Sequence, residues 1–207
     1  MIVGNLPELL KSSNADAHRI LERVVDVMNP AYTLSGYSML VSRFYGFIKP
    51  WENALRSSLP KALVPLFADR YKAAWLEQDL QDLQIATSLT VASPVASAAS
   101  FCSSLPDMST TARLLGSAYV IEGSSLGGRF IESYLERSFG SENIVPHKYF
   151  YCYGSKTGSM WKKYLAMLAV QVSEENYPDA LDAAAQTFAC MTDWFSGIRS
   201  QPVTCHD

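Results

Sequence analysis

The chain has 207 residues, of which 48% are hydrophobic and 18% are charged, and this is enough to bury one core without disulfide or metal support. A net charge of −3 gives no electrostatic basis for binding nucleic acid. The four cysteines and three histidines lack the spacing of a disulfide framework or zinc site, and the N-terminus lacks the basic and apolar regions of a signal peptide. We therefore expect one cytoplasmic domain over residues 1–207, without a membrane span.

The first predicted helix covers about residues 6–28. Asn5 is a suitable N-cap, Pro7 falls in the first turn, and Glu8 stands where a capping box places its acidic residue. An apolar stripe at helical spacing continues along the whole segment.

His18 lies at the edge of that stripe. Glu22 follows it by one turn and Lys11 precedes it by two turns, so all three side chains are expected on one side of a continuous helix. Taken alone, this pattern indicates a half-exposed histidine paired with a glutamate.

Further helices are predicted over residues 32–57, 69–84, 114–139, 158–172 and 178–198. The aromatic residues of the second helix recur at helical spacing, which indicates core packing. Residues 86–111 are rich in Ala, Ser, Thr and Val, and we expect either a mobile connection or a loosely packed short helix there. A flexible tail is expected at 201–207. Strand-like alternation is missing from the sequence, so the predicted fold class is all-α.

The most unusual segment is residues 114–134, which combines helical apolar spacing with a glycine-rich centre. Each interior glycine costs a helix roughly 0.5–1 kcal/mol relative to alanine. Gly116, Gly123 and Gly127 fall on one stripe without side chains. The pattern therefore predicts that something flat or close lies against this stripe.

Three other interpretations of the glycines compete with this one. They could form a turn between two helices, or a close helix crossing of the small-xxx-small type. A membrane span is disfavoured because Arg113, Glu122 and Arg129 interrupt the apolar run. The known phosphate-loop patterns do not match.

Several segments resemble the heme oxygenases, particularly the bacterial members that supply biliverdin to bacteriophytochromes. Residues 9–22, LLKSSNADAHRILE, are similar to the opening helix of that family, and residues 116–131, GSAYVIEGSSLGGRFI, are similar to its distal-helix signature. Residues 37–55, YSMLVSRFYGFIKPWENAL, and the R-x-K-x₃-L-x-x-D-L run at 70–80 also look familial. The resemblance covers most of the chain in order.

This resemblance implies an all-α, single-domain helical bundle with heme between the first helix and a glycine-kinked distal helix. His18 would be the proximal iron ligand, and Glu22 would hydrogen-bond its second ring nitrogen. Lys11 would pair with a heme propionate, since seven residues of one helix span about 10 Å. Lys162 and Arg129 are further propionate candidates, although each could equally be a solvated surface charge.

On the distal side, the resemblance implies that Gly123, Gly127 and Gly128 let the backbone approach the porphyrin and bound O₂. Some family members have an aspartate at the position of Ser124, where it orders the water chain that delivers protons. The sequence does not assign that role here.

The implied activity is cleavage of heme, as both substrate and cofactor, to biliverdin, CO and free iron. Because the chain has no Rossmann or flavin pattern, electrons are expected from an external ferredoxin or flavoprotein reductase, with a bacteriophytochrome as a candidate biliverdin acceptor. The alternatives are a non-catalytic heme carrier or sensor, and a helical interaction domain whose glycines serve only packing.

Overall fold

The computed structural model describes residues 5–87, 101–139 and 146–196. Within these ranges all regular elements are helical, which confirms the all-α prediction. The helices are α1 Leu6–Ser13, α2 Ala15–Val25, α3 Leu34–Ser58, α4 Val64–Phe67, α5 Ala73–Thr87, α6 Thr111–Gly123, α7 Gly128–Phe139, α8 Lys148–Tyr151, α9 Thr157–Gln171 and α10 Tyr177–Ser196. A 3₁₀ turn, η2 (Ser124–Gly127), joins α6 to α7. None of the described helices is both long enough and apolar enough to span a bilayer.

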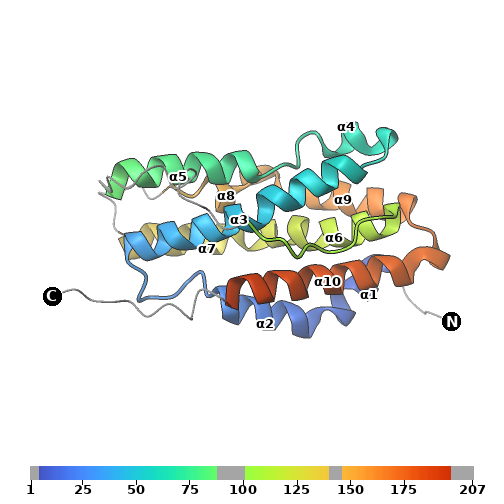
Figure 1. The fold of residues 1–207 in the computed structure, drawn as a ribbon, viewed down its shortest axis with the longest axis horizontal. Helices are drawn as coiled ribbons and strands as arrows, with labels where there is room; N and C mark the ends of the chain where they lie inside the picture. The colour runs from blue at the N-terminus through green and yellow to red at the C-terminus, as the bar shows by residue number, and fades with distance from the viewer. Residues whose placement is uncertain (1–4, 88–100, 140–145, 197–207) are drawn as a thin grey trace.

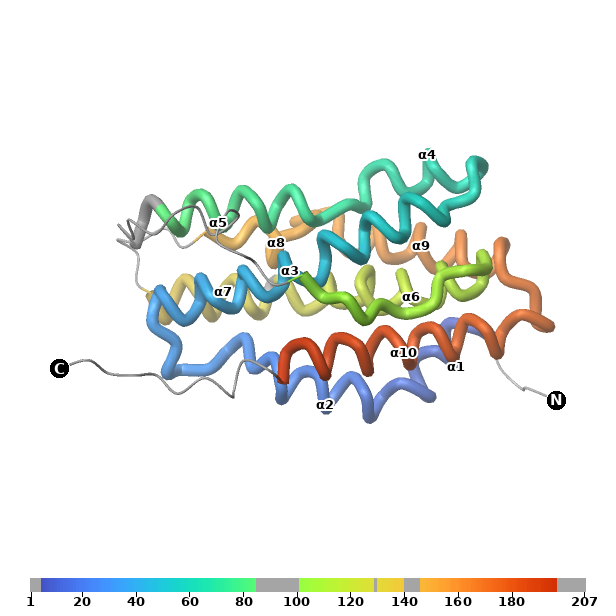
Figure 2. Tube along the Cα trace, viewed as in Figure 1, coloured from blue at the N-terminus to red at the C-terminus, as the bar shows by residue number. Residues whose placement is uncertain are grey.

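The helices form a bundle in which α6 and α7 run end to end through the middle (Figures 1 and 2). Helix α10 packs against both α6 and α2, and therefore connects the N-terminal helices to the glycine-containing one. On the other side α3 pairs with α5, and α8 contacts both α5 and α7. Helix α1 contacts α9 as well as α10.

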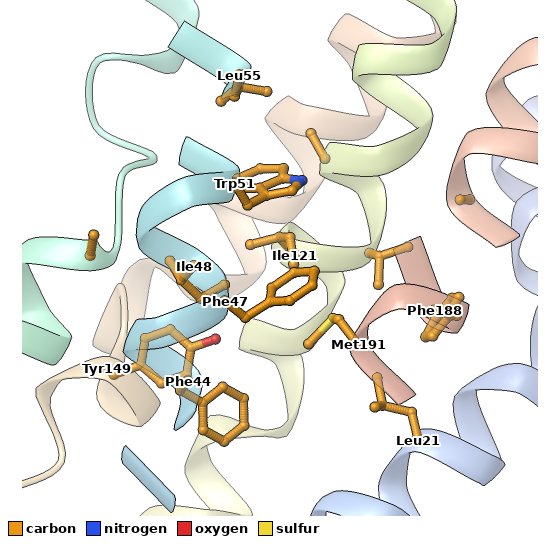
Figure 3. Packing of buried hydrophobic residues seen from close by; sticks show 14 of the residues in the cluster. Leu21, Phe44, Phe47, Ile48, Trp51, Leu55, Ile121, Tyr149, Phe188 and Met191 are labelled. Atoms are coloured by element: carbon orange, nitrogen blue, oxygen red, sulfur yellow. The ribbon is translucent and has the colours of Figure 1, made fainter. Parts of the chain in front are cut away.

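The core is rich in aromatic side chains, and α3 supplies many of them (Figure 3). The ring of Phe44 lies 4.7 Å from that of Phe195 and 5.2 Å from that of Tyr149. Trp51 is also buried and donates a 2.9 Å hydrogen bond from its indole nitrogen to Ser117 Oγ of α6. The prediction that the aromatic stripe is core is confirmed.

The prediction of one continuous first helix is wrong. Its start is confirmed, because the Glu8 backbone N–H donates to Asn5 Oδ1 over 3.1 Å. At Asn14, however, the chain leaves helical geometry (φ −105°, ψ 7°), and the Asn14 side chain donates to the Leu10 carbonyl. Such a local side-chain bond competes with the helix. Helix α2 then ends at Asp26, which has a left-handed conformation with φ 47°.

The predicted start of the third helix is also wrong. Helix α5 begins at Ala73, and residues 70–72 form an irregular segment before it. The reason is a contact from α3, since Glu52 Oε1 accepts hydrogen bonds from the backbone N–H groups of Lys72 and Ala73. A buried carboxylate thus caps the new helix.

Of the Ala/Ser-rich connection at 86–111, residues 88–100 lie outside the described residues, as does the whole predicted tail at 201–207. Residues 101–110 are described and contain no helix. The Cys102 backbone N–H donates to the Gly46 carbonyl of α3, and the Asp107 N–H donates to Gln186 Oε1 of α10. Residues 101–110 therefore do not form the short helix, and they are hydrogen-bonded to both α3 and α10.

Candidate functional site

His18 stands on α2 with 55% of its side chain exposed. Its Nδ1 atom lies 3.4 Å from Glu22 Oε2, and its ring meets the edge of Phe188 of α10 at a centroid distance of 5.9 Å. The expected pairing of His18 with Glu22 is confirmed. The imidazole is supported on one side by α10 and reachable from solvent on the other.

The position of Glu22 selects one of the two imidazole nitrogens for a ligand. A carboxylate beside Nδ1 favours a proton on that atom, and in neutral imidazole the lone pair is then on Nε2. Metal-bound histidines usually have this arrangement, with an acceptor at the second nitrogen. His18 is thus suited to bind a metal through Nε2.

The basic residues proposed for heme propionates lie on different elements. Lys11 is exposed on α1, and because the chain breaks at Asn14, the straight-helix distance of about 10 Å to His18 does not apply. Lys162 is exposed on α9, which packs against α1, so the two lysines stand on neighbouring helices. Arg129 is the second residue of α7, but its side chain lies outside the described part of the chain.

Two of the glycines are explained by close backbone approach. A Cβ atom at Gly116 would lie 2.0 Å from the Ala180 carbonyl oxygen of α10, and one at Gly128 would lie 2.0 Å from the Phe150 carbonyl oxygen of α8. The close-crossing interpretation is therefore confirmed at Gly116. At Gly128 the side without a side chain is filled by the protein's own backbone.

The other two glycines differ from these and from each other. A Cβ at Gly123 would reach Trp161 at 3.6 Å, which is an ordinary contact, whereas one at Gly127 would meet none of the described atoms within 4 Å. The glycines of the stripe thus face different neighbours, and among the described residues it is Gly127 that faces open space. Leu126 and Phe130 beside it are also exposed, and 76% of Phe130 is accessible.

Ser124 and Ser125 are anchored to the end of α6. Ser124 Oγ donates to the Ile121 carbonyl over 2.8 Å, and Ser125 Oγ donates to the Glu122 carbonyl over 2.7 Å. Ser124 is exposed, and its hydroxyl interacts electrostatically with the buried Tyr149 phenol. Burial raises the pKa of Tyr149, and the interaction with Ser124 opposes that rise only in part, so the phenol remains a proton donor at neutral pH.

A buried charged cluster behind η2 was not predicted from the sequence. Glu122 is 3% exposed, and its carboxylate accepts hydrogen bonds from Arg70 Nη1 and Lys72 Nζ, while the Tyr153 hydroxyl donates to it over 2.9 Å. We call Glu122, Arg70, Lys72 and Tyr153 the Glu122 network. The available signal was the R-x-K pattern at 70–72, in which two cations stand together before an amphipathic helix.

Further N–H donors of Arg70 and Lys72 also have hydrogen-bond acceptors. Arg70 Nε donates to the Leu66 carbonyl and its Nη2 to the Met160 carbonyl, over 3.0 and 3.3 Å. Lys72 Nζ makes further contacts of 3.3 Å to the Arg70 carbonyl and the Tyr153 hydroxyl. Burial, reinforced by the Glu122 charge, raises the pKa of Tyr153, which therefore acts as a donor.

Comparisons with known proteins agree with this fold. A family model described as heme oxygenase matches residues 4–197. A solved structure described as heme oxygenase from Leptospira interrogans aligns with a TM-score of 0.70, covering 94% of this chain and 100% of that one at 15% sequence identity. At that identity the likeness establishes the fold alone. A search of curated protein sequences gives no match.

Proposed function

Because this chain belongs to the heme oxygenase family, we propose that it cleaves heme to biliverdin, CO and free iron, using O₂ and electrons from an external donor. The family match and the fold support heme degradation in general. The products and the residue roles below are the further content of the proposal.

The proximal side would be formed by α2. His18 would bind the heme iron through Nε2, while Glu22 keeps the proton on Nδ1 and orients the ring. Lys11 and Lys162 would pair with the propionates, since both are exposed and their helices are in contact. When bound, heme supplies the iron that activates O₂ and also the carbon skeleton that is cleaved.

The distal side would be formed by η2 and the start of α7. Gly127 would lie over the macrocycle, because its bare side faces open space, and Leu126 and Phe130 would supply apolar contacts to the porphyrin. Gly128 would act by letting the start of α7 pack closely on α8 and so hold this turn, while Gly123 would face the Trp161 side chain at ordinary contact distance. Ser124, backed by the Tyr149 phenol, would hold the proton donated on this side.

The partners follow from the same proposal. A ferredoxin or flavoprotein reductase would supply electrons in the cytoplasm, and a bacteriophytochrome is the proposed acceptor of biliverdin. The observation that carries the proposal is the His18 imidazole, exposed to a ligand and presented with a carboxylate at Nδ1.

Adding hemin to the purified chain tests it. We expect a Soret band with the signature of an axial histidine, followed by a green product, CO and released iron when reductant and O₂ are supplied. A stable Soret band without product or CO would favour the non-catalytic carrier or sensor. If hemin produces no specific Soret band, the heme proposals are wrong and the glycines serve packing alone.

A further inference from the structure

The Glu122 network stands directly behind the turn that would face the heme, yet the proposed reaction does not use it. Glu122 is the residue before Gly123, and its backbone carbonyl accepts the hydrogen bond from Ser125 Oγ. Its side chain is fixed by the network, and its main chain stands two residues before the start of η2. The position of this turn is therefore coupled to the carboxylate.

The network joins three separate parts of the chain at that point. Arg70 and Lys72 come from the segment before α5, Glu122 from the end of α6, and Tyr153 from the residues after α8. Among the described residues, none of these four side chains has a buried nitrogen or oxygen atom without a hydrogen-bond partner. Buried polar networks that are fully satisfied are rigid and specify one arrangement.

The backbone next to Tyr153 provides a second observation. Cys152 has φ 51° and ψ −114°, a conformation that non-glycine residues rarely adopt. Such backbone strain persists only where surrounding contacts determine the conformation, and it concentrates at functional sites. Here the strained residue directly precedes the phenol that donates to Glu122.

The chemistry of the site also requires a carboxylate. Two buried cations approach Glu122, one at each of its oxygens, and the phenol contacts both oxygens over 2.9 and 3.2 Å. A glutamine in this place would keep one carbonyl oxygen and turn an NH₂ group toward a cation. Neutralising Glu122 would thus change the network without changing the size of the side chain.

We propose that Glu122 is a positioning residue for the distal turn: held by Arg70, Lys72 and Tyr153, it fixes where Gly127 and Ser124 stand relative to bound heme. This inference rests on the proposed function, because it assigns η2 to the distal side. Glu122 itself does not touch the heme.

The test compares two tyrosine-to-phenylalanine variants in the hemin complex. Tyr153→Phe removes the half-buried hydroxyl that donates to Glu122, whereas the control Tyr164→Phe removes a fully buried hydroxyl that donates to the Leu115 carbonyl, earlier in α6. We expect Tyr153→Phe to speed amide hydrogen exchange at residues 124–128 by roughly two- to tenfold, the change for one hydrogen bond. The affinity of the ferric heme for azide, which binds on the distal side, should change as well.

The affinity for hemin itself should remain that of the unmodified chain, because the hydrogen bonds of the network among the described residues do not involve α2, which carries His18. Tyr164→Phe should leave both the exchange at 124–128 and the azide affinity unchanged. Equal effects of the two variants, or no effect of either, would overturn the positioning role while leaving hemin binding and turnover by the unmodified chain intact. Loss of hemin binding by the unmodified chain would instead overturn the proposed function.

Glu122→Gln provides an independent measurement with a larger perturbation. If it folds, exchange at 124–128 and azide affinity should change more than in Tyr153→Phe, and in the same direction. Unchanged exchange and azide affinity in a folded Glu122→Gln protein would contradict the inference. If Glu122→Gln does not fold, the Tyr153→Phe comparison decides.

Discussion

The two sides of the candidate site are built in opposite ways. On α2, His18 is more than half exposed and its Nδ1 atom lies 3.4 Å from Glu22 Oε2, so little of the fold depends on it. The turn η2, on the proposed distal side, instead adjoins the Glu122 network, whose charged side chains are buried and hydrogen-bonded to one another. The proposed roles would thus separate binding from positioning, because a ligand from solvent must reach the first side, whereas the second must keep its geometry.

The largest effect is expected from a substitution on the exposed α2 side of the candidate site. His18→Ala should abolish the axial-histidine spectrum of the hemin complex and reduce turnover by at least about 100-fold, the upper end of what loss of an outer-shell partner costs. Stability should change by no more than about 0.5 kcal/mol, as for other surface substitutions. Absorption spectra and urea unfolding measure the two quantities. An unchanged heme spectrum would remove His18 from the site.

On the distal side, substitutions at two glycines distinguish a role in packing from a role in ligand contact. Gly128→Ala should lower the free energy of unfolding by about 1–3 kcal/mol, because the new Cβ meets the backbone oxygen of Phe150, which cannot rotate away. Gly127→Ala should be neutral or stabilising by up to about 1 kcal/mol, since nothing lies within 4 Å. Urea unfolding without heme gives both values.

A bulkier substitution, Gly127→Leu, tests whether the open side of Gly127 faces the heme. It should fold as Gly127→Ala does, but bind hemin more weakly or turn it over more slowly, because the added side chain would occupy the space assigned to the porphyrin. If turnover remains unchanged, the open side of Gly127 does not face the heme.

The smallest expected effect concerns the scaffold behind the distal side. Asp79 of α5 is buried, and its carboxylate accepts hydrogen bonds from the backbone N–H groups of Lys148 and Tyr149 at the start of α8. Burial raises its pKa above the ordinary value of 3.8, and these hydrogen bonds oppose the rise. The native state therefore holds the proton more tightly, so the contribution of Asp79 to stability is full below pH 3.8 and declines as pH rises through the higher native pKa.

Asp79→Asn removes this titration. The free energy of unfolding of the variant, relative to that of the unmodified chain, should increase as pH rises from about 4 to about 7. Urea unfolding at several pH values measures the slope. A relative stability that worsens with rising pH would mean that Asp79 is more acidic when folded than when unfolded.

Local patterns predicted much of the fold. Periodic apolar spacing located the long helices, Asn5 was predicted as an N-cap from its position before Leu6, and the aromatic stripe of α3 was assigned to the core. These features depend on neighbours within a few residues. The break at Asn14 was missed because the apolar spacing continues across it, although asparagine favours local side-chain bonds over helix.

The distal scaffold was harder to predict because its partners are distant in sequence. Bare glycines correctly indicated a close approach, but only the tertiary fold shows that Ala180 approaches Gly116 and Phe150 approaches Gly128. In the sequence, Glu122 stands out only as a charge within an apolar run. Its burial depends on two cations fifty or more residues earlier, and a single sequence does not reveal such a pairing.

Paramagnetic broadening of backbone amide signals by ferric heme tests directly whether heme lies between the two sides. Residues 18–22 of α2 and 124–128 of the distal turn should both broaden when hemin binds, while the exposed Val170 near the end of α9 serves as a remote reference. Simultaneous broadening at both segments is the predicted result. Broadening at only one of them, or strongest elsewhere in the bundle, would contradict a heme site formed by His18 and Gly127.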